Sequence, residues 1–487
     1  MLPSKLTQLL AFYLPQYHPI PENDEWWGKG FTEWRNVTRG RPLFRGHYQP
    51  HVPASLGYYD LRLPEVREQQ AALALQAGLN GFVFFHYWFG GRRLLERPVD
   101  DMLRLGKPDF PFCLCWVNEA WSRNWDGDSR DVLMPQAYSV ADDIEHIKWL
   151  CAAFKDDRYL KIDGCPLLFV YRPSDLPSMR ETAERWRKEA AGRGFPGLFL
   201  CGVQSLAGDL RDPAEFGLDA AVEFEPTSTD PGPPLRSSDP LQIGYQLHRV
   251  WSYDSLVRKC LERDLPPYRF FPGLCPSWDN SVRRREGGVI LKDSTPAKYQ
   301  AWLRELLYRE WFRPQKESIV LVNAWNEWAE GNHLEPCERW DNGYIDATRQ
   351  AIDDSRGTIA SIGSFQSGMK VVLTPQYEVT GKIDSRRSGP GEAHLEGWSV
   401  EAMAKGAPDM LALAERLKDG GFGLIGPVQA QRIPRADVAA IHGQASMLSG
   451  WKASYRQQAG QPAPREVVVL ALRGHDRSVA LVAPLIL

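Results

Sequence analysis

Two glutamates that lie close together after an apolar run are the strongest candidates for chemistry in this sequence. Glu327 and Glu330 occur in "NAWNEWAEGNHLEP" (323–336), which directly follows "SIVLV". Trp325 and Trp328 alternate with them along the chain. A carboxyl group beside indole rings is partly removed from water, which disfavours its charged form and raises its pKa. A raised pKa suits a general acid at neutral pH.

Glycosidic bond cleavage requires two carboxyl groups, one to protonate the leaving oxygen and one to act as nucleophile or base. We therefore predict that Glu327 and Glu330 are catalytic. Glu119 in "CWVNEAW" is a rival partner for Glu327, because Asn-Glu at a strand end supplies the acid/base of many retaining barrel glycosidases. The preferred interpretation of Glu119 is structural, as an ion pair with Arg123 or a hydrogen bond that positions substrate.

A set of buried strands is needed to hold these glutamates. Eight short apolar runs occur before residue 330, at residues 8–14, 81–88, 110–119, 166–172, 197–203, 219–224, 268–278 and 318–328. Amphipathic segments predict helices between several of them, at 63–78, 140–154, 179–194 and 295–310. Apolar strands that alternate with helices indicate a parallel sheet covered on both faces. Eight units, with no Gly-rich phosphate-binding turn, favour a (β/α)8 TIM-like barrel over an open sheet.

In such a barrel the carboxyl ends of the strands meet at one face, which carries the catalytic loops. The chain contains 18 Trp and 17 Tyr, and aromatic rings stack on the apolar faces of sugars. We predict sugar contacts for polar and aromatic residues at the strand ends and in the following loops: Tyr13, His18, Trp27, Trp34, His86, Tyr87, Trp88, Asn118, Glu119, Trp121, Tyr171, Trp278, Asp279, Asn326 and Trp328.

Several of these residues have a plainer alternative. A lone histidine among aromatic residues, such as His86, is more often a packed core residue than a ligand contact. Trp27 and Trp34 could pack against the barrel rim instead of forming a sugar platform. The basic run 283–285 is expected to be solvated or paired with carboxylates, although it could also meet an acidic sugar.

The composition changes after residue 352, where Trp becomes rare and Cys is absent. We predict a catalytic barrel over 1–354, a linker over 355–370 and a β-sandwich accessory domain over 371–487. Eight Cys lie between Cys113 and Cys337, several of them in apolar runs, which favours buried free thiols. Without Cys/His pairs at zinc-ligand spacing, we expect neither a metal nor another cofactor.

Charge and hydropathy limit the classes of partner. The 58 basic and 61 acidic residues give a net charge of -3, which offers no general attraction for nucleic acid. No apolar run approaches the roughly 20 residues of a membrane span. The first residues resemble a strand more than a signal peptide, so a cytoplasmic protein is expected. The sequence does not indicate an oligomeric state.

Four motifs together carry a resemblance to a known family: "FYLPQYHPIPENDEWWGKGFTEW", "LLERPV", "FPFCLCWVNEAW" and "NAWNEWAEGNHLEP". The first 350 or so residues resemble the WbsX-like proteins of bacterial polysaccharide loci, which are similar to glycoside hydrolase family 99. The resemblance implies a (β/α)8 barrel and a retaining mechanism through a 1,2-anhydro sugar. Glu327 would then be the base on the sugar 2-hydroxyl, and Glu330 the acid and later the base. Ala120 departs from the pattern, because the group usually has Asn there.

The expected substrate is a bacterial surface polysaccharide or a mannose- or rhamnose-type polysaccharide, cleaved by hydrolysis. The first alternative is a glycosyltransferase or transglycosylase of O-antigen or polysaccharide biosynthesis, which would pass the same intermediate to a sugar hydroxyl. A nucleotide-sugar transferase should also show a diphosphate-binding nest or a metal-binding DxD motif. The second alternative is a non-catalytic glycan-binding protein, which would keep the aromatic residues without needing both glutamates.

Overall fold

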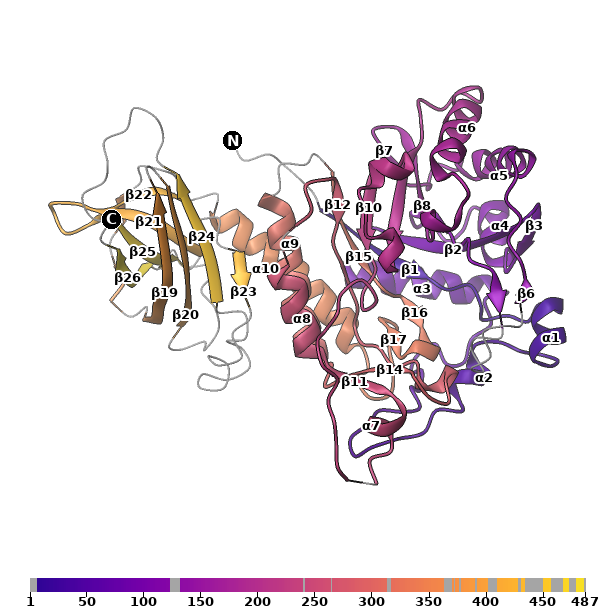
Figure 1. Cartoon of the computed structure of the whole chain (residues 1–487), viewed down its shortest axis with the longest axis horizontal. Coiled ribbons are helices and arrows are strands. Elements are labelled where there is room, and N and C mark those ends of the chain that lie inside the picture. The colour runs from indigo at the N-terminus through magenta and orange to yellow at the C-terminus, as the bar shows by residue number, and fades with distance from the viewer. Residues whose placement is uncertain are drawn as a thin grey trace.

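A barrel and a group of antiparallel sheets lie at opposite ends of the molecule, with helices between them (Figure 1). The computed structural model describes residues 7–122, 132–239, 241–263, 265–312 and 317–362. In the C-terminal part it describes 370–371, 373–375, 378–389, 392–401, 410–427, 431–433, 450–456, 467–472 and 479–485. Arg123, the predicted partner of Glu119, lies outside these residues.

The barrel is built from parallel strands that coincide with the eight apolar runs. They are β1 (Thr7–Tyr13), β2 (Gly81–Phe89), β4 (Phe112–Trp116), β8 (Cys165–Val170), β9 (Phe199–Gln204), β10 (Ala220–Glu223), the pair β12 (Phe270–Phe271) and β13 (Gly273–Leu274), and β15 (Ser318–Val322). Every pairing among them is parallel. This arrangement confirms the predicted fold class.

The seventh strand closes the barrel in two pieces. Its first piece, β12, pairs with β10, and its second piece, β13, pairs with β15. Only Pro272 separates the pieces, and a proline cannot donate a ladder hydrogen bond. The carbonyl of Pro272 nevertheless accepts from the backbone N–H of Leu321. The interruption therefore costs the sheet little of its continuity.

Helices cover the outside of the barrel: α3 (Pro64–Ala77), α4 (Arg97–Leu105), α5 (Val140–Ala153), α6 (Met179–Ala191), α8 (Tyr253–Glu262), α9 (Pro296–Phe312) and α10 (Gly343–Ile362). Ser139 and Ser178 cap α5 and α6 by accepting hydrogen bonds from the N–H groups of Asp142 and Glu181. The four helices predicted from the sequence correspond to α3, α5, α6 and α9, with ends that differ by a few residues.

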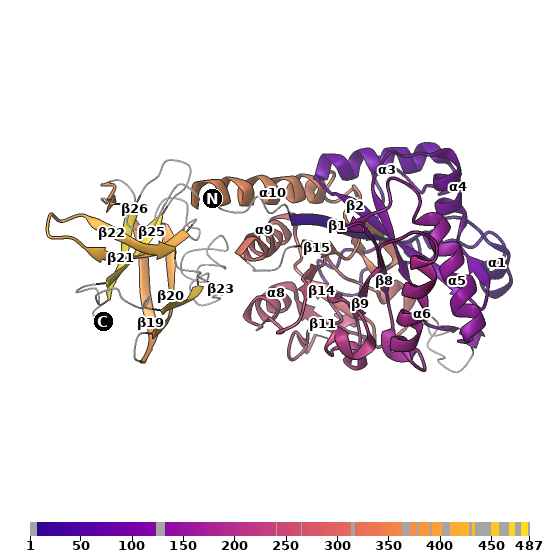
Figure 2. The same cartoon turned by 90° about the horizontal axis from the view of Figure 1, so that it is seen from above.

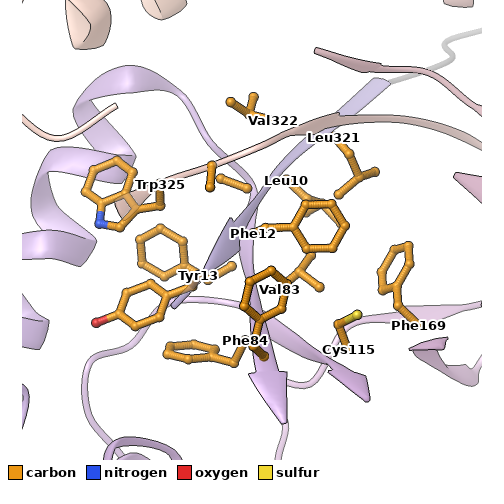
Figure 3. Packing of buried hydrophobic residues seen from close by; sticks show 14 of the residues in the cluster. Leu10, Phe12, Tyr13, Val83, Phe84, Cys115, Phe169, Leu321, Val322 and Trp325 are labelled. Atoms are coloured by element: carbon orange, nitrogen blue, oxygen red, sulfur yellow. The ribbon is translucent and has the colours of Figure 1, made fainter. Parts of the chain in front are cut away.

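The interior of the barrel is filled by aromatic side chains. The ring of Phe12 lies at 5.6 Å from that of Phe85, 6.1 Å from Phe169 and 5.3 Å from Phe224, so one side chain of β1 touches the far wall (Figure 3). Because side chains alternate between the two faces of a strand, the neighbour Tyr13 points outward. Its hydroxyl donates to Gln70 of α3 at 2.6 Å.

The C-terminal part contains two antiparallel sheets. One consists of β18 (Lys370–Val371), β21 (Met410–Arg416), β22 (Phe422–Pro427), β25 (Val467–Leu472) and β26 (Val479–Leu485), and the other of β19 (Val379–Gly389), β20 (Glu392–Glu401), β23 (Gln431–Ile433) and β24 (Gly450–Arg456). Ala412 and Leu470 of the first sheet share a hydrophobic cluster with Tyr308 of α9. The sheets therefore pack on the helical layer, as Figure 2 also shows.

Helix α10 extends from the barrel toward these sheets and continues through Ile362, inside the segment predicted as a linker. The domain boundaries themselves stay a prediction. Within the described residues, none of the helices combines the length and the apolar character that crossing a membrane requires.

Candidate active site

The residues after β15 form a tight hairpin at the mouth of the barrel. It consists of β16 (Asn326–Glu327), the short 3-10 helix η6 (Trp328–Glu330) and β17 (Asn332–His333), with β16 and β17 antiparallel. Gly331 turns the chain with a φ of 57°, and a Cβ atom there would lie 3.1 Å from both Asp279 and His51. The turn therefore requires glycine.

Asn326 fixes the start of the hairpin to the first strand. Its Oδ1 accepts from the N–H of Leu14 at 2.8 Å, and its Nδ2 donates to the carbonyl of Leu14 at 3.0 Å. The Tyr17 hydroxyl donates to the Asn326 carbonyl at 2.6 Å. Asn326 is fully buried and positions Glu327, and its predicted sugar contact stays a prediction.

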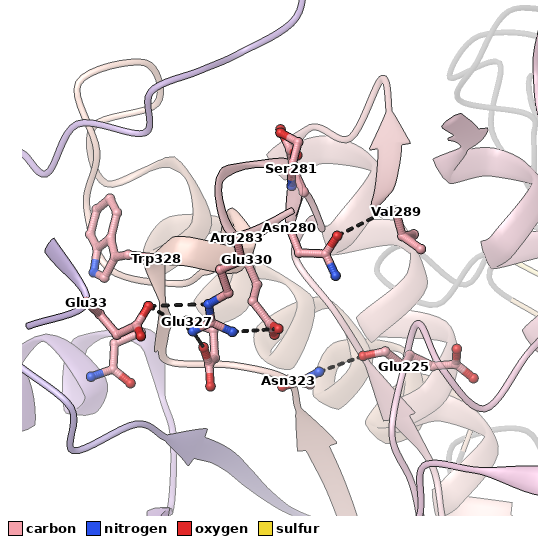
Figure 4. A network of polar contacts seen from close by, with 12 residues as sticks. Glu33, Glu225, Asn280, Ser281, Arg283, Val289, Asn323, Glu327, Trp328 and Glu330 are labelled. Carbon is pink, nitrogen blue, oxygen red and sulfur yellow. Dashed lines mark hydrogen bonds and ion pairs between the residues drawn. The ribbon is translucent and has the colours of Figure 1, made fainter. Parts of the chain in front are cut away.

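Arg283 lies at the centre of three carboxylates (Figure 4). Its Nη1 donates to Glu330 at 2.7 Å, and its Nη2 donates to Glu327 at 3.1 Å and to Glu33 at 3.0 Å. The three glutamates come from two distant parts of the sequence, the loop after β1 and the hairpin after β15. One cation for three acids leaves an excess of negative charge in a nearly dry setting, where electrostatic effects are strong.

The pKa values of the two hairpin glutamates reflect this setting. Burial and the neighbouring Glu330 raise the pKa of Glu327 to about 8, against the opposing effect of Arg283. Burial also raises the pKa of Glu330, and Arg283 again opposes the increase. When two acids interact closely, protons bind to the pair and not to one group alone. The pair therefore holds a proton near neutral pH, so one group can donate a proton while the other accepts one.

A second layer of residues supports Glu330 from behind. The N–H of Asp279 donates to the Glu330 carbonyl, and the Ser277 hydroxyl donates to the Gly331 carbonyl. The carboxylate of Asp279 is itself held by His47 at 2.6 Å and by Gln49 at 2.7 Å. Asp279 therefore holds the loop behind Glu330, and its predicted contact with substrate stays a prediction.

An aromatic cavity of about 150 Å³ opens at the barrel mouth. Trp27, Tyr87, Glu119 and Trp121 line it, all of them predicted sugar contacts. The carbonyl of Gln16, which also lines this cavity, accepts from the N–H of Glu33 at 3.2 Å, so the cavity adjoins the carboxylate network. Burial and the charge of Glu327 raise the pKa of the Tyr87 hydroxyl well above its usual value. Tyr171 is likewise under the influence of Glu119 and Glu330. The positions of these residues are compatible with contacts to a sugar. Sugar contacts of Trp27, Tyr87, Glu119, Trp121 and Tyr171 stay predictions.

Comparison with known proteins identifies the family. The model of the family described as "Glycosyltransferase WbsX" matches residues 9–348, which span the whole barrel. The chain belongs to the WbsX family. Uncharacterized protein WxcX from two strains of Xanthomonas campestris pv. campestris, B100 and ATCC 33913, is 46% identical over 345 residues, or 71% of this chain. The chain spans about half, 49%, of the length of these relatives.

Solved structures with a similar fold include a GH99 endo-alpha-mannosidase from Bacteroides thetaiotaomicron, at 15% identity and a TM-score of 0.44. The match covers 72% of this chain and 98% of that one. A protein described as glycoside hydrolase-like is 14% identical, with a TM-score of 0.45, over 72% and 94% of the two chains. We draw no conclusion about the activity of this WbsX-family protein from likeness at this level.

Alternation along β2 decides which of its aromatic residues reach the mouth. Phe85 points into the barrel, so Tyr87 does too, whereas His86 and Trp88 point outward. His86 stacks on Trp149 of α5 with 4.7 Å between ring centres, and Trp88 donates to Asp142 of α5 at 2.8 Å. Tyr13 of β1 faces α3 for the same reason. This packing against α3 and α5 does not favour the sugar contacts expected of Tyr13, His86 and Trp88, which stay predictions.

Three further residues make packing or backbone contacts: Trp34, Trp328 and Asn118. Trp34 donates to the Tyr59 carbonyl at 2.7 Å, and Trp328 stacks on His333 with ring centres 3.7 Å apart. Both are buried, and their predicted role as sugar platforms stays a prediction. Asn118 is fully buried and exchanges two hydrogen bonds of 2.8 Å with the backbone of Arg172. It shapes the loop that carries Glu119, and its predicted sugar contact stays a prediction as well.

His18 and Trp278 lie near but not in the aromatic cavity. His18 is buried, and burial lowers its pKa to about 4, so its ring is neutral. Trp278 is buried too and lines a separate cavity of about 80 Å³ beside His51 and Arg339. Substrate contact of these two residues stays a prediction.

One group of side chains within the described residues has the spacing of metal ligands: Glu223, Glu225 and Cys260. Glu223 is already engaged, because Arg263 donates to one of its oxygens and the Gly273 N–H donates to the other at 3.0 Å. Burial and Glu223 raise the pKa of Glu225 well above its usual value, which favours its neutral form. A neutral acid beside an arginine-paired carboxylate is a poor cation site, so we assign this group to the core.

Sequence analysis missed the two residues that complete the site. Glu33 lies in "GFTEW", and one acid in a loop carries no signal by itself. Arg283 was predicted to pair with carboxylates or to be solvated. Its partners could not be identified from the sequence, because 44 residues separate it from Glu327 and 250 from Glu33. The structure shows that it pairs with both.

Proposed function

We propose that this WbsX-family protein is a glycan-active enzyme, a retaining glycoside hydrolase in which Glu327 and Glu330 carry the chemistry. One observation supports this proposal above the others. Two buried carboxyl groups with raised pKa values share one arginine at the mouth of a (β/α)8 barrel, beside an aromatic cavity. A purely structural ion pair would lower the pKa of its acids, whereas catalysis by proton transfer needs values near the working pH.

In the mechanism implied by the sequence resemblance, Glu327 and Glu330 supply and accept every proton that moves. Glu327 takes the proton of the sugar 2-hydroxyl, and the resulting O2 forms a bond to C1. The bond from C1 to the leaving oxygen breaks, and Glu330 gives its proton to that oxygen. In the second step Glu330 takes a proton from water, the water oxygen bonds to C1, the C1–O2 bond breaks, and O2 recovers its proton from Glu327. Two inversions at C1 give net retention.

The division of roles requires the proton of the pair to lie on Glu330 once the sugar is bound, whereas the pKa of about 8 places it on Glu327 in the free protein. The accessibility of the two groups supports the division. The side chain of Glu330 is 18% exposed and that of Glu327 is 8% exposed. The acid must reach the oxygen between two sugars and later admit water, whereas the base needs to meet only one hydroxyl. Arg283 stabilises the carboxylate that each group becomes in turn.

Transfer to a sugar hydroxyl is the second candidate, favoured by the description of the family as a glycosyltransferase. The same two glutamates would serve, with an acceptor hydroxyl replacing water. The substrate class proposed for either reaction is a bacterial surface polysaccharide, or one of mannose or rhamnose type.

The test uses Glu327→Gln and Glu330→Gln with α-mannan, rhamnan and O-antigen oligosaccharides, each incubated with and without sugar nucleotides. We expect each substitution to reduce sugar release or transfer by a factor of about 10² to 10⁴, the usual contribution of a general acid or base. Binding of the oligosaccharide should remain measurable. The matched control is Glu145→Gln, which removes an exposed glutamate paired only with Lys148 on the surface. Wild-type turnover by both active-site variants would reject the proposal.

A further inference from the structure

A strongly basic cleft has Arg283 in its wall. Its volume is about 510 Å³, and its walls come from α1 (Pro21–Trp27), α2 (Trp34–Val37), the segment that follows α2, and residues 247–248 and 281–285. Six arginines line it: Arg35, Arg39, Arg41, Arg283, Arg284 and Arg285. No aspartate or glutamate is among the described residues that line it.

Most of this positive charge is not neutralised by the protein. Arg283 is engaged by its three glutamates, and Arg35 donates to the backbone carbonyl of Trp27 at 2.6 Å. Over the part of the chain that the structure describes, Arg39, Arg41, Arg284 and Arg285 form no ion pair with a carboxylate. All four are exposed and line the same cleft, although the net charge of the whole chain is -3.

The cleft is continuous with the proposed reaction site. Arg283 forms part of its wall and also donates to Glu327 and Glu330, and the charge of Arg284 reaches Glu330 strongly enough to lower its pKa. Trp27 lines both this cleft and the aromatic cavity that contains Glu119 and Trp121. A chain of sugars could therefore run from the aromatic cavity past the glutamates into the basic cleft. Helix α1 lies far from the C-terminal sheets in both views, so those sheets do not cover this path (Figures 1 and 2).

We propose that this cleft binds an anionic group, a carboxylate or a phosphoryl group, carried by the sugar substrate next to the bond that reacts. Guanidinium groups match the planar oxygens of such anions and bind them with paired hydrogen bonds. Trp26, Trp27 and Phe31 at one end provide rings for the attached sugar. The inference rests on the proposed function for the sugar, and it adds that the substrate is acidic. The charge has two possible sources, a uronic acid within the glycan or the diphosphate of an activated sugar.

The experiment measures binding by calorimetry with three probes: a mannose trisaccharide that carries one glucuronic acid, the same compound with its carboxyl reduced to an alcohol, and GDP-mannose. We expect at least one charged probe to bind about tenfold or more tightly than the reduced trisaccharide, a difference of about 1.4 kcal/mol. The advantage should shrink between about 50 mM and about 300 mM NaCl, because exposed charges are screened by salt. Preference for the glucuronic acid assigns the charge to the glycan, and preference for GDP-mannose assigns it to an activated donor.

The test variant is Arg39→Gln/Arg41→Gln, because both side chains are exposed and their loss leaves the Arg283 network intact. The matched control is Lys161→Gln/Lys188→Gln, which removes the same charge from exposed positions outside the cleft. We expect the first double variant to lose the preference for the anion and the control to keep it. Equal binding of charged and reduced probes by the wild type, or an unchanged preference in Arg39→Gln/Arg41→Gln, would overturn the inference. Binding does not require turnover, so failure of the glutamate variants to affect catalysis would reject the proposed function separately.

Discussion

Arg283 and Glu330 form the shortest contact of the carboxylate network, with 2.7 Å between Nη1 and Oε1. The same guanidinium also contacts Glu327 and the fully buried Glu33. This arginine therefore sets the charge balance of the whole site, because removing it would leave three acids with no cation. Glu33 has the opposite effect on the pKa of Glu327 and Glu330, since it adds a negative charge beside them. These two residues should move the pH dependence of activity in opposite directions.

We expect Arg283→Gln to shift the pH profile of kcat toward higher pH. Arg283 lowers the pKa of both Glu327 and Glu330, so its loss raises both values, and a higher pH is then needed to ionise the base. The variant should also be less stable by about 3 to 5 kcal/mol, the usual effect of leaving buried charges without their partner. Arg283→Lys should restore part of the profile. A pH profile that does not move would show that Arg283 has no influence on the reacting groups.

Glu33→Gln is expected to shift the same profile toward lower pH. The charge of Glu33 raises the pKa of Glu327 and of Glu330, and glutamine keeps nearly the same shape without that charge. One oxygen of Glu33 accepts from Arg283, and the other has no hydrogen-bond partner among the described residues. Kinetics from about pH 5 to about pH 9 would be compared with those of Arg283→Gln. Shifts of the same sign in the two variants would contradict this electrostatic account.

The barrel could be predicted from the sequence because each strand is a nearly continuous apolar run with a helix or long loop after it. The strand ends could not be assigned so simply. Residues such as His86, Tyr87 and Trp88 follow one another at the end of β2, and only the middle one points toward the mouth. Side chains of a strand alternate between the two faces of the sheet, so every second residue faces the barrel interior. Which of the two sets faces inward is fixed by a neighbour that fills the barrel, here Phe85.

The hairpin glutamates could be predicted because both lie in one short motif with flanking tryptophans. Their partners could not, since Glu33 and Arg283 are brought together only by closure of the barrel. The prediction also treated buried polar residues near a strand end as ligand contacts. Asn118, Asn326 and Asp279 each use polar atoms to hold the backbone of a loop, and a sequence does not distinguish that role from binding a sugar.

Glu119→Gln should separate the preferred catalytic pair from its rival. The Glu119 carboxylate accepts from Arg172 at 3.0 Å and 3.2 Å, and its side chain is 42% exposed. A group in that environment contributes to binding more than to proton transfer, so we expect kcat to change by less than about tenfold, against about 10² to 10⁴ for Glu327→Gln. KM is expected to rise, since Glu119 lines the aromatic cavity. A loss of kcat as large as that of Glu327→Gln would instead support Glu119 and Glu327 as the reacting pair.

Stability should fall as the pH drops from 7 to 5, in part because of two histidines behind β2. His86 and His146 lie 3.0 Å apart between their Nε2 atoms, and burial lowers the pKa of His86 to about 3 and that of His146 well below its usual value. Arg93 nearby further disfavours a charged His86.

The sign of the effect follows from where protons bind. Below pH 6.5 the unfolded chain takes up protons on these imidazoles while the folded chain does not, so acid favours unfolding. Each histidine should cost about 2 kcal/mol between pH 7 and pH 5. We therefore expect His86→Phe/His146→Leu to lose stability less steeply than the wild type over this range, as measured by urea unfolding followed through tryptophan fluorescence. A comparison at pH 8, where both imidazoles are neutral in either state, corrects for the change in packing. Parallel curves for the two proteins would show that neither histidine has a lowered pKa in the folded state.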